Sequence, residues 1–595
     1  MSLNFLSAIV EYAESRYDGK ALHYKPSGSQ QWNSFSWKEF AELTRKTSAA
    51  LMQLGVKRED NVAIFSQNMP EWTIADLGIM CSNAVSVPIY ATNTSDQAKY
   101  IIYEAEIHFI FVGEEDQYIK ALEIYSQDDC PLEKIIVLDR KVKIDTACAI
   151  YFEEFLKLGD NISLDKVKKV SNSISKDDLA TIIYTSGTTG VPKGVMLIHK
   201  NFNVTAKIHD IRLSIDQNNH SLAFLPLSHI FERAWSLYAL YKGVGVSYLK
   251  DPKQIIETLK EVKPTMMCSV PRLYQKAYHT ILSKIEGSSN IKKSLFNAAL
   301  KTGEKVADIK RINKNLPFLL AVKYKILDTI VLKKIRKAFG GRLKFMPCAG
   351  APLSAEITSF FHSIGMPVLI GYGLTETTAT VTVFPDSGYE FGTVGLSMPE
   401  IEIKIGPDDE IWVRGETVMK GYYKKPEETA KVIQDGWLKT GDAGKINESG
   451  ILTITDRIKD LMKTSGGKYV APQPVESLLT NDNFIENAIL IGDDKPYVTA
   501  LLVPNFEALK EYAHSMNLKY NNLEELIKKS GIIGFYEEKL ERLQKSLANF
   551  EKVKKFRLLH QDFNMQLGEL TPTLKIRREM ILKNFTPLIE EMYSF

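Results

Sequence analysis

A loop rich in glycine and hydroxyl side chains is the part of the sequence best suited to chemistry. Residues 184–194 read YTSGTTGVPKG and follow the run ATII at residues 180–183, so the loop begins where we expect a strand to end. Glycines let a ligand approach the backbone, hydroxyl groups donate hydrogen bonds, and Lys193 adds a positive charge. Together these groups predict a binding site for a polyphosphate.

The loop is not a Walker P-loop, in which a lysine directly follows a glycine and precedes a serine or threonine. Here Pro192 precedes Lys193 and Gly194 follows it. A loop of Ser, Thr and Gly is weak evidence by itself, because many such loops are simple turns. Its meaning therefore depends on the rest of the chain.

Six further blocks follow this loop along the chain. All seven together resemble the signature of the adenylate-forming enzymes, which include acyl-CoA synthetases, luciferases and the adenylation domains of peptide synthetases. Seven blocks in the correct order are far more specific than any one of them. The six are LPLSHIFER at 225–233, AGAPL at 349–353, GYGLTET at 371–377, WLKTGD at 437–442, DRIKD at 456–460 and LTPTLK at 570–575.

The resemblance implies a two-step reaction. A carboxylate attacks the α-phosphorus of ATP to give an acyl adenylate and pyrophosphate, and a thiol, most often that of coenzyme A, then displaces AMP. Because the reacting groups are anionic, the site needs cations and hydrogen-bond donors. Thr185 and Glu376 would hold Mg²⁺, a hard ion that prefers oxygen ligands. The alternative role for Glu376 is to cap a helix.

The same resemblance implies a nucleotide site. Tyr372 would stack on adenine, beside Gly350 and Ala351. Asp442 would accept hydrogen bonds from the ribose hydroxyls, and Arg457 would reach the ribose or the phosphate. Taken alone, a tyrosine is more often a core residue, and an Asp–Arg pair a surface ion pair. The expected ATP- and AMP-binding residues are Thr185, Ser186, Gly187, Thr188, Thr189, Gly190, Lys193, Gly350, Ala351, Tyr372, Gly373, Thr375, Asp442 and Arg457.

Catalytic roles also follow from the resemblance. Lys575 would bridge the substrate carboxylate and the α-phosphate, although the two residues before it differ from the Ser-Gly of many relatives. His229 would position the acyl carboxylate rather than act as a base, because a carboxylate nucleophile is already ionised. We expect Glu232 and Arg233 to form a supporting pair. The expected catalytic residues are Lys575, His229, Glu376 and Thr185.

In this family the small C-terminal domain swings about a hinge between the two half-reactions. The swing exchanges Lys575 for a face that admits the thiol. Lys459 occupies the hinge position. The turn formed by Ser465, Gly466 and Gly467 would approach the pantetheine arm of coenzyme A.

The sequence pattern around these blocks predicts an α/β fold. Short β-rich runs at residues 61–65, 86–90, 108–112 and 134–138 alternate with amphipathic stretches such as residues 36–54. This alternation is typical of a parallel sheet covered by helices on both faces. The same rhythm recurs after residue 200, which favours a second α/β layer.

The pattern of hydrophobic and turn residues changes toward the C-terminus. From about residue 391 to 455, short alternating runs between Gly, Pro and Asp turns predict a small β-barrel-like part. The chain then reads as a small α+β unit with a long helix over residues 523–550. We therefore expect an N-terminal adenylation domain of residues 1–458, with layered α/β subdomains to about residue 390, and a small mobile C-terminal domain of residues 459–595.

The charge is nearly balanced overall but not locally. The 595 residues carry 75 Lys+Arg and 72 Asp+Glu, a net charge of +3, too small to favour a partner made of nucleic acid. Between Lys301 and Lys344, thirteen Lys/Arg and three Asp/Glu give a local charge of +10. Residues 326–339 look helical, with Lys334 inside the apolar arc. The segment predicts either a solvated helical face or peripheral association with an anionic membrane.

The location of the protein is also bounded by its sequence. The five cysteines are widely spread without a CxxC pair, and the first residues lack a signal-peptide pattern. We find no apolar run long enough to span a bilayer. We therefore expect a cytoplasmic protein, peripheral at most at the inner face of the membrane. The oligomeric state is left open.

The acyl substrate is indicated less strongly. LPLSHIFER, the basic segment and LTPTLK together resemble bacterial-type long-chain fatty acid–CoA ligases. A long chain needs an apolar tunnel, in which each buried CH₂ contributes about 0.8 kcal/mol; Trp235 and Leu237 are candidates for its wall, with ordinary helix packing as the alternative. Other open functions are a fatty acyl–AMP ligase that serves a carrier protein, another carboxylate–CoA ligase, or a non-catalytic nucleotide- or lipid-binding homologue.

Overall fold

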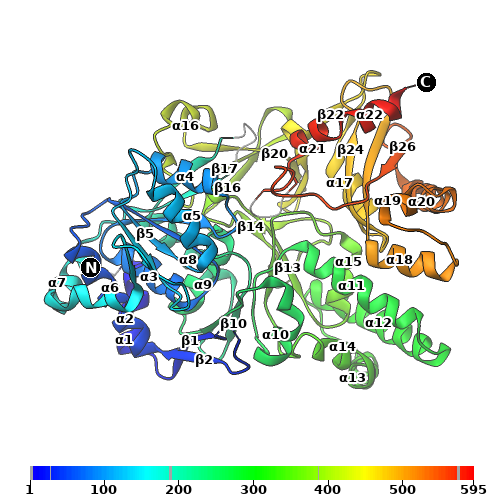
Figure 1. The fold of residues 1–595 in the computed structure, drawn as a ribbon. Helices are drawn as coiled ribbons and strands as arrows, with labels where there is room; N and C mark the ends of the chain where they lie inside the picture. Colours follow the sequence, from blue (N-terminus) through cyan, green and yellow to red (C-terminus); the bar gives the residue numbers. More distant parts are fainter. Residues whose placement is uncertain (1–3, 27, 186–190, 386, 572–575, 595) are drawn as a thin grey trace.

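An eight-stranded sheet forms the centre of the first part of the chain (Figure 1). The computed structural model describes residues 4–26, 28–185, 191–385, 387–571 and 576–594. The strands pair in parallel except that β9 runs antiparallel to both β8 and β18. In sheet order the strands are β18 (Gly421–Tyr422), β9 (Lys193–Ile198), β8 (Leu179–Thr185), β4 (Val85–Tyr90), β3 (Asn61–Ser66), β5 (Phe109–Val112), β6 (Lys134–Val137) and β7 (Ala149–Tyr151).

Both faces of this sheet are buried, as the near-continuous apolar strands predict. Alternate side chains of β3 belong to different cores: Val62 and Ile64 to one, Ala63 and Phe65 to the other. The predicted strands and the helix at 36–54 are confirmed to within a residue or two. The helices that pack around this sheet are α1 (Phe5–Ser15), α2 (Trp37–Gln53), α3 (Pro70–Cys81), α4 (Ser95–Glu104), α5 (Glu115–Tyr125), α6 (Phe152–Leu158), α7 (Leu164–Ser173) and α8 (His199–Arg212).

A second group of strands, most of which follow residue 200 as expected, makes two further sheets, and two strands from near the N-terminus join the first of them. The four-stranded sheet has the order β10-β11-β1-β2. Single parallel bridges from Met266 to Ser221 and Phe345 connect it to the next sheet. Its strands are β10 (His220–Ala223), β11 (Gly245–Tyr248), β1 (Lys20–Tyr24) and β2 (Asn33–Ser36). The helices of residues 230–363 are α9 (Ile230–Tyr241), α10 (Ile255–Val262), α11 (Pro271–Glu286), α12 (Asn290–Arg311), α13 (Phe318–Leu327), α14 (Lys333–Lys337) and α15 (Ala355–Ser363).

The small β part at about 391–455 continues a sheet of the α/β part. Gly371 and Tyr372 at the end of β13 pair antiparallel with β14, and the sheet runs on through β15 and β21 to β16. The backbone segment predicted to hold adenine is therefore tied to the segment predicted to hold ribose. The strands are β12 (Met346–Cys348), β13 (Val368–Tyr372), β14 (Thr382–Val383), β15 (Gly395–Ser397), β21 (Ile451–Arg457), β20 (Trp437–Ile446), β17 (Glu410–Arg414), β16 (Glu402–Ile405) and β19 (Ile433–Gln434).

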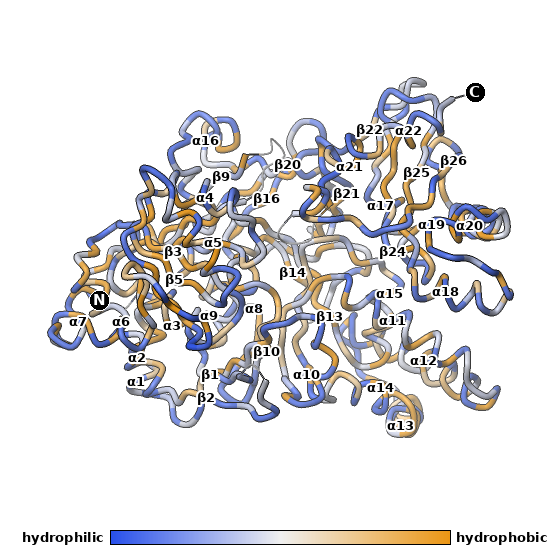
Figure 2. Tube along the Cα trace, in the orientation of Figure 1, coloured by the Kyte–Doolittle hydropathy of each residue, from blue (hydrophilic) through white to orange (hydrophobic). Residues whose placement is uncertain are grey.

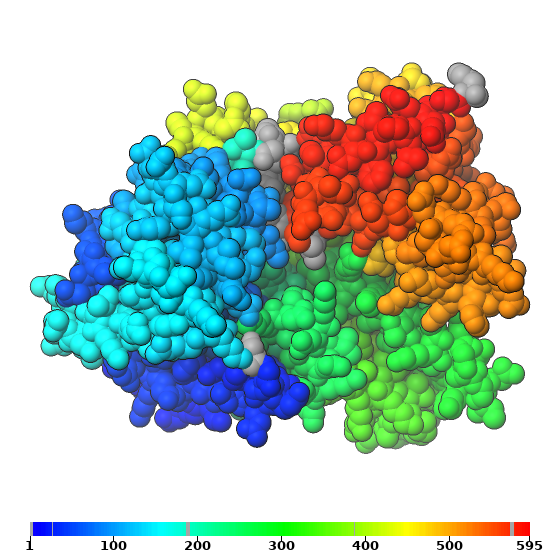
Figure 3. Space-filling model, viewed as in Figure 1, coloured from blue at the N-terminus to red at the C-terminus, as the bar shows by residue number. Residues whose placement is uncertain are grey.

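The C-terminal part is a smaller α+β domain, seen in orange and red against the larger domain in Figure 3. Its sheet, in the order β24-β25-β26, has a separate core on each face. The long helix expected at 523–550 is divided into α19 and α20, because Lys529 between them is extended. The elements are α17 (Pro472–Thr480), β24 (Ile485–Ile491), β25 (Val498–Pro504), α18 (Phe506–Ser515), α19 (Leu523–Ile527), α20 (Ser530–Leu543), β26 (Val553–Leu558), α21 (Arg578–Asn584) and α22 (Thr586–Tyr593).

The architecture confirms the predicted fold class, a large N-terminal α/β domain followed by a small α+β domain. Figure 2 shows the hydrophobic residues gathered on the strands of the sheets. None of the helices in the described part of the chain combines the length and apolar character needed to cross a bilayer.

A fully buried ion pair connects the first sheet to the helices on one of its faces. The Arg233 guanidinium on α9 donates to both carboxylate oxygens of Asp76 on α3, at 2.8 and 2.5 Å. It also donates to the Thr181 hydroxyl on β8, and the Ser86 hydroxyl on β4 donates to Asp76. Both charged side chains are 0% exposed. The pair thus satisfies its own polar atoms at the place where four elements meet.

The supporting pair expected between Glu232 and Arg233 is wrong. Adjacent residues on a helix point about 100° apart, so Glu232 faces elsewhere. Its carboxylate accepts hydrogen bonds from the Leu225 backbone N–H (3.1 Å), the Ser236 hydroxyl and the Cys268 thiol. Burial raises the pKa of Glu232 to about 7. Glu232 therefore holds the backbone at the end of the strand that leads to His229.

Replacing Arg233 tests the weight of the buried pair. Arg233→Met keeps the length of the side chain but leaves the Asp76 carboxylate buried and unpaired, which we expect to cost about 3–5 kcal/mol. Urea unfolding of the purified protein measures the loss as a lower midpoint. Arg414→Met is the control, because Arg414 pairs with Glu402 at the surface and should change the midpoint little. Equal shifts in the two variants would contradict the assignment.

Candidate active site

The two strands at the phosphate loop place its ends side by side. Thr185 is the last residue of β8 and Lys193 the first of β9, and the two are directly paired in the antiparallel register. The tyrosine before the loop, Tyr184, is buried. The predicted phosphate-binding residues Ser186, Gly187, Thr188, Thr189 and Gly190 lie outside the described residues.

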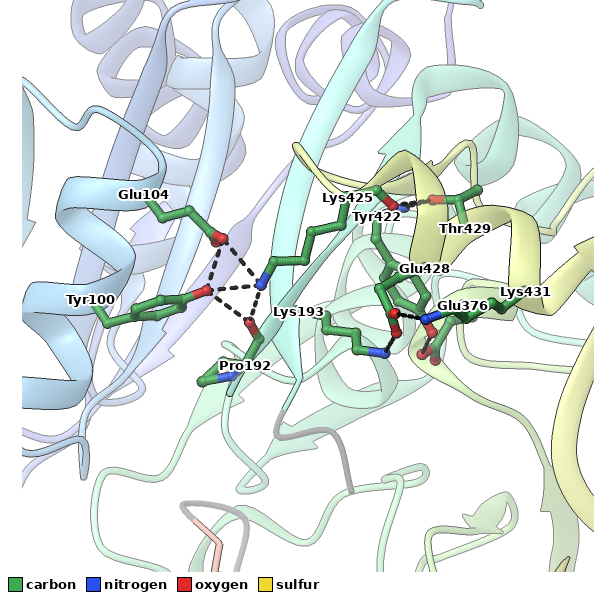
Figure 4. Close-up of polar contacts among 10 residues, drawn as sticks. All are labelled: Tyr100, Glu104, Pro192, Lys193, Glu376, Tyr422, Lys425, Glu428, Thr429 and Lys431. Atoms are coloured by element: carbon green, nitrogen blue, oxygen red, sulfur yellow. Dashed lines mark hydrogen bonds and ion pairs between the residues drawn. The ribbon is translucent and has the colours of Figure 1, made fainter. Parts of the chain in front are cut away.

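The loop lysine is held by the segment that contains β18 and α16 (Pro426–Val432) (Figure 4). Lys193 Nζ lies 2.6 Å from Glu428 Oε2 and 5.1 Å from the centre of the Tyr422 ring. Glu428 also contacts Lys431, at 2.5 Å. The hydrogen bond from Lys193, followed by that from Lys431, lowers the pKa of Glu428 to about 2. The Lys193 ammonium thus has a fixed position beside the loop.

A second set of contacts fixes the residue before the lysine (Figure 4). The Pro192 carbonyl accepts hydrogen bonds from Tyr100 Oη and Lys425 Nζ, both at 3.2 Å. Tyr100 and Lys425 also contact each other at 2.9 Å, and Glu104 on α4 contacts both. These contacts therefore fix the backbone at Pro192, directly before β9 begins.

The predicted metal ligand Glu376 lies near the same segment. It sits in a short 3-10 helix, Thr375–Thr377, after β13, and its Oε1 accepts a hydrogen bond from Tyr422 Oη at 2.9 Å. Burial, and then the nearby Glu376 carboxylate, raise the pKa of Tyr422. A carboxylate with the Thr185 hydroxyl fits Mg²⁺, which takes one or two carboxylates when phosphates supply further oxygens.

The residues predicted to hold adenine and ribose form one cluster. Tyr372 Oη donates to Asp442 Oδ2 at 2.6 Å, and Arg457 Nε lies 3.2 Å from Asp442 Oδ1. Asp442 and Arg457 are cross-strand neighbours on β20 and β21. Tyr372 and Asp442 are buried, whereas Arg457 is 45% exposed. The aspartate is thus oriented from two sides.

Small residues shape the backbone around this cluster. A Cβ on Gly373 would lie 1.8 Å from the Ala379 carbonyl oxygen, so only glycine fits there. Gly350 has a φ of +93°, which favours glycine, and its neighbour Ala351 is exposed. Thr375 is buried at the start of the short helix before Glu376. Gly373 is thus required by the close approach of the backbone at Ala379, and Gly350 by its left-handed conformation.

His229 stands at the start of α9. Its Nδ1 accepts a hydrogen bond from the Phe231 backbone N–H at 3.2 Å, so His229 caps the helix. In the neutral ring, this contact leaves the proton on Nε2. The fixed tautomer suits the predicted role of positioning a group rather than removing a proton from it.

An apolar cavity begins beside the Tyr372 cluster. Its walls include residues of α8 and α9, Phe5 of α1, and the ends of β12, β13 and β14, with Ala349 and Tyr372 among them. Trp235, predicted to line an acyl tunnel, contributes to the wall. Leu237, the other candidate, is buried but does not line this cavity.

The predicted hinge and coenzyme A residues lie on the C-terminal side. Lys459 is an exposed residue of the short helix Ile458–Asp460, directly after β21. Ser465, Gly466 and Gly467 form an exposed turn between two short strands, β22 (Met462–Lys463) and β23 (Tyr469–Val470). Lys575 lies outside the described residues.

The sequence reasoning missed several residues of this site. Tyr422, Lys425 and Glu428 carry no motif that marks them in advance. His209, on α8, is a polar group in the cavity wall: Nδ1 lies 2.7 Å from the Thr205 carbonyl and Nε2 3.3 Å from Thr380 Oγ1. Burial lowers the pKa of His209, so the ring is neutral near pH 7.

Comparison with known proteins places the chain in a class of enzymes. Residues 10–423 match the AMP-binding enzyme family, and residues 459–595 match the C-terminal domain of AMP-binding enzymes. The chain therefore belongs to the AMP-binding enzyme family.

Relatives and solved structures refine the position within this family. The long-chain-fatty-acid–CoA ligase FadD15 of Mycobacterium bovis is 30% identical over 99% of this chain and 97% of its own length. Long chain acyl-CoA synthetase 7 of Arabidopsis thaliana is 30% identical, with coverages of 99% and 86%. The crystal structure of the anthranilate CoA ligase AuaEII with anthranoyl-AMP has the same fold, with a TM-score of 0.74 at 18% identity and 99% coverage of both chains.

The anchor before Lys193 can be tested with two adjacent lysines. We expect Lys425→Met to weaken ATP binding about tenfold, because it removes a group that fixes the end of the phosphate loop, and positioning of charged groups is worth at least this much. Isothermal titration with ATP measures the change. Lys424→Met is the matched control: Lys424 pairs with Glu106 and donates to the Glu104 backbone carbonyl rather than to that of Pro192. This variant should stay within about twofold of the wild type. Unchanged ATP affinity in folded Lys425→Met protein would refute the anchor.

Proposed function

We propose that the protein activates a long-chain fatty acid with ATP and transfers the acyl group to coenzyme A. Membership of the AMP-binding family supports the activation step, and the names of the relatives support the acyl group and the thiol. The observation that carries the proposal is the apolar cavity that begins beside Tyr372. An apolar chain in this cavity would present its carboxylate to the nucleotide site.

The apolar lining of the cavity supports an acyl chain as the group bound there. Its wall includes Phe202 and Ala206 of α8, and Leu213, which follows this helix. Each methylene removed from water contributes about 0.8 kcal/mol, so chain length translates directly into binding.

In the first step, a carboxylate oxygen attacks the α-phosphorus of ATP and the bond to pyrophosphate breaks. Lys193 and the phosphate loop hold the β- and γ-phosphates, while Asp442 orients the ribose. Tyr372 packs against adenine. His229 and Lys575 position the acyl carboxylate, and Lys575 also contacts the α-phosphate. These groups counter the charge that gathers in the transition state.

Glu376 and Thr185 would hold Mg²⁺, which would neutralise phosphate charge. Tyr422 supports this role because its hydroxyl orients the Glu376 carboxylate. The Glu428 carboxylate, in turn, orients the Lys193 ammonium by accepting its hydrogen bond. The segment that carries both residues therefore serves the phosphate end of the site.

In the second step, the thiol of coenzyme A loses its proton and attacks the acyl carbonyl, and AMP leaves with the electrons of the acyl–phosphate bond. The C-terminal domain rotates at Lys459 between the two steps, which brings Ser465, Gly466 and Gly467 toward the pantetheine arm. The exposure of this turn supports the assignment. The free thiols of all five cysteines support a cytoplasmic location.

A screen of acids tests the substrate. We expect pyrophosphate release to rise with the length of the carboxylic acid to at least about twelve carbons, because each added methylene enters the apolar cavity. Acyl-CoA formation, followed by mass spectrometry with and without coenzyme A, tests the acceptor. A flat dependence on chain length would overturn the long-chain assignment, and acyl adenylate that free coenzyme A never consumes would favour a carrier protein as acceptor.

A variant that fills the cavity tests whether the acyl chain binds there. Ala206 on α8 lines the cavity, so Ala206→Phe should lower activity with long acids more than tenfold while largely keeping activity with short acids. The short acid is the control for folding and for the nucleotide site. Equal losses at every chain length would place the acyl group elsewhere.

Lys575 tests the alternation of the two half-reactions. Lys575→Ala should reduce adenylate formation at least a hundredfold, because it removes the cation that bridges carboxylate and α-phosphate. Thioester formation from supplied acyl-AMP and coenzyme A should stay near the wild-type rate. Separate rapid-quench assays of the two steps make this comparison, and an equal loss in both would contradict the alternation.

A further inference from the structure

The α13 helix presents apolar side chains to solvent at the edge of the molecule. Phe318 and Leu319 are 80% and 82% exposed, and Val322, Ile326 and Ile330 are 43–55% exposed. Figure 2 shows α13 as a largely hydrophobic helix at the periphery. Scattered exposed apolar residues are ordinary, but a contiguous row of them is not.

The positions of these residues define a single face. At 100° per residue, Phe318, Val322, Ile326 and Leu319 fall within an arc of about 100°. Leu327, on the opposite side, is buried in the core. The outward side of α13 is therefore apolar as well as the inward side that packs on the core, whereas an ordinary surface helix turns a polar side to solvent.

Positive charges border this face. On the same helix, Lys325 lies about 20° outside one edge of the apolar arc and Lys323 about 40° outside the other. Both are exposed. Between residues 312 and 340, the exposed lysines are Lys314, Lys323, Lys325, Lys333, Lys334 and Lys337.

The sequence had indicated a different arrangement. A helix was expected at 326–339, with Lys334 interrupting its apolar arc. In the structure the helix begins earlier, at Phe318 after Pro317, and a π-helical stretch, Asp328–Leu332, separates it from α14. Lys334 therefore lies on α14, beyond the apolar row.

We propose that the α13 face, defined as Phe318, Leu319, Val322 and Ile326 with Lys323 and Lys325, binds the surface of an anionic lipid bilayer. A helix with apolar side chains flanked by lysines can insert shallowly while its ammonium groups meet lipid phosphates. The local charge of +10 between Lys301 and Lys344 is complementary to such a surface. A second copy of the chain would bring the same positive charge against it, and like charges oppose that contact.

Vesicle binding tests the proposal with the full-length protein and no substrate. We expect flotation with vesicles of phosphatidylcholine and 30% phosphatidylglycerol, far weaker binding to pure phosphatidylcholine, and loss of binding as salt rises from 50 to 500 mM. Phe318→Ser with Leu319→Ser should weaken binding at least tenfold. Ile291→Ser is the matched control, because Ile291 on α12 is also 80% exposed but lies outside the face.

The charged part of the face has its own variants. Lys323→Gln with Lys325→Gln should weaken binding about tenfold or more, since each lysine near an anionic surface contributes about a fivefold effect. Lys510→Gln with Lys519→Gln removes the same charge from exposed positions of the C-terminal domain and should bind like the wild type. All substituted side chains are exposed, so folding should not be affected.

Three results would overturn the proposal: binding unaffected by the Phe318 and Leu319 variants, equal binding to neutral and anionic vesicles, or a dimer in solution that the same variants dissociate. Because flotation needs neither ATP nor an acid, failure here leaves the proposed reaction untouched. Failure of the acid screen would equally leave the vesicle result standing.

Discussion

The rest of the site depends on the antiparallel pairing of β9 with two neighbours. On one side β9 pairs with β8, which sets Thr185 opposite Lys193. On the other it pairs with β18, which leads directly into α16. Backbone hydrogen bonds thus bring residues 421–432 to the phosphate loop before any side chain makes a contact. Glu428, Lys425 and Tyr422 then act on groups more than forty residues away in the chain.

This pairing also divides the work of the site between two sheets. The eight-stranded sheet carries Thr185 and Lys193, proposed to hold the phosphates, and the nine-stranded sheet carries Tyr372, Asp442 and Arg457. The short helix with Glu376 bridges them, because it follows β13 of one sheet and contacts Tyr422 of the other. The proposed acyl cavity begins where these parts meet, so nucleotide and acid would share one wall at Tyr372 and Ala349.

The sequence predicted what local patterns can encode. Apolar runs marked the central strands closely, because a strand buried on both faces leaves little room for polar residues. Ordered blocks marked candidate site residues such as Lys193, at the start of β9, and Asp442, within β20. Contacts between distant segments were not accessible: Lys193 and Glu428 are 235 positions apart, and no periodicity relates them. Adjacency in sequence was also a poor guide to contact. Glu232 and Arg233 were expected to pair, but they point to different sides of their helix.

The two cores of the C-terminal sheet have a consequence for the energetics of rearrangement. Because β24, β25 and β26 bury both faces within their own domain, the domain keeps its hydrophobic stabilisation in any orientation. Its contacts with the larger domain include a surface ion pair between Arg272 and Glu486, a type of contact worth little in water. Breaking a surface contact of this kind would cost the domain little free energy during a reorientation.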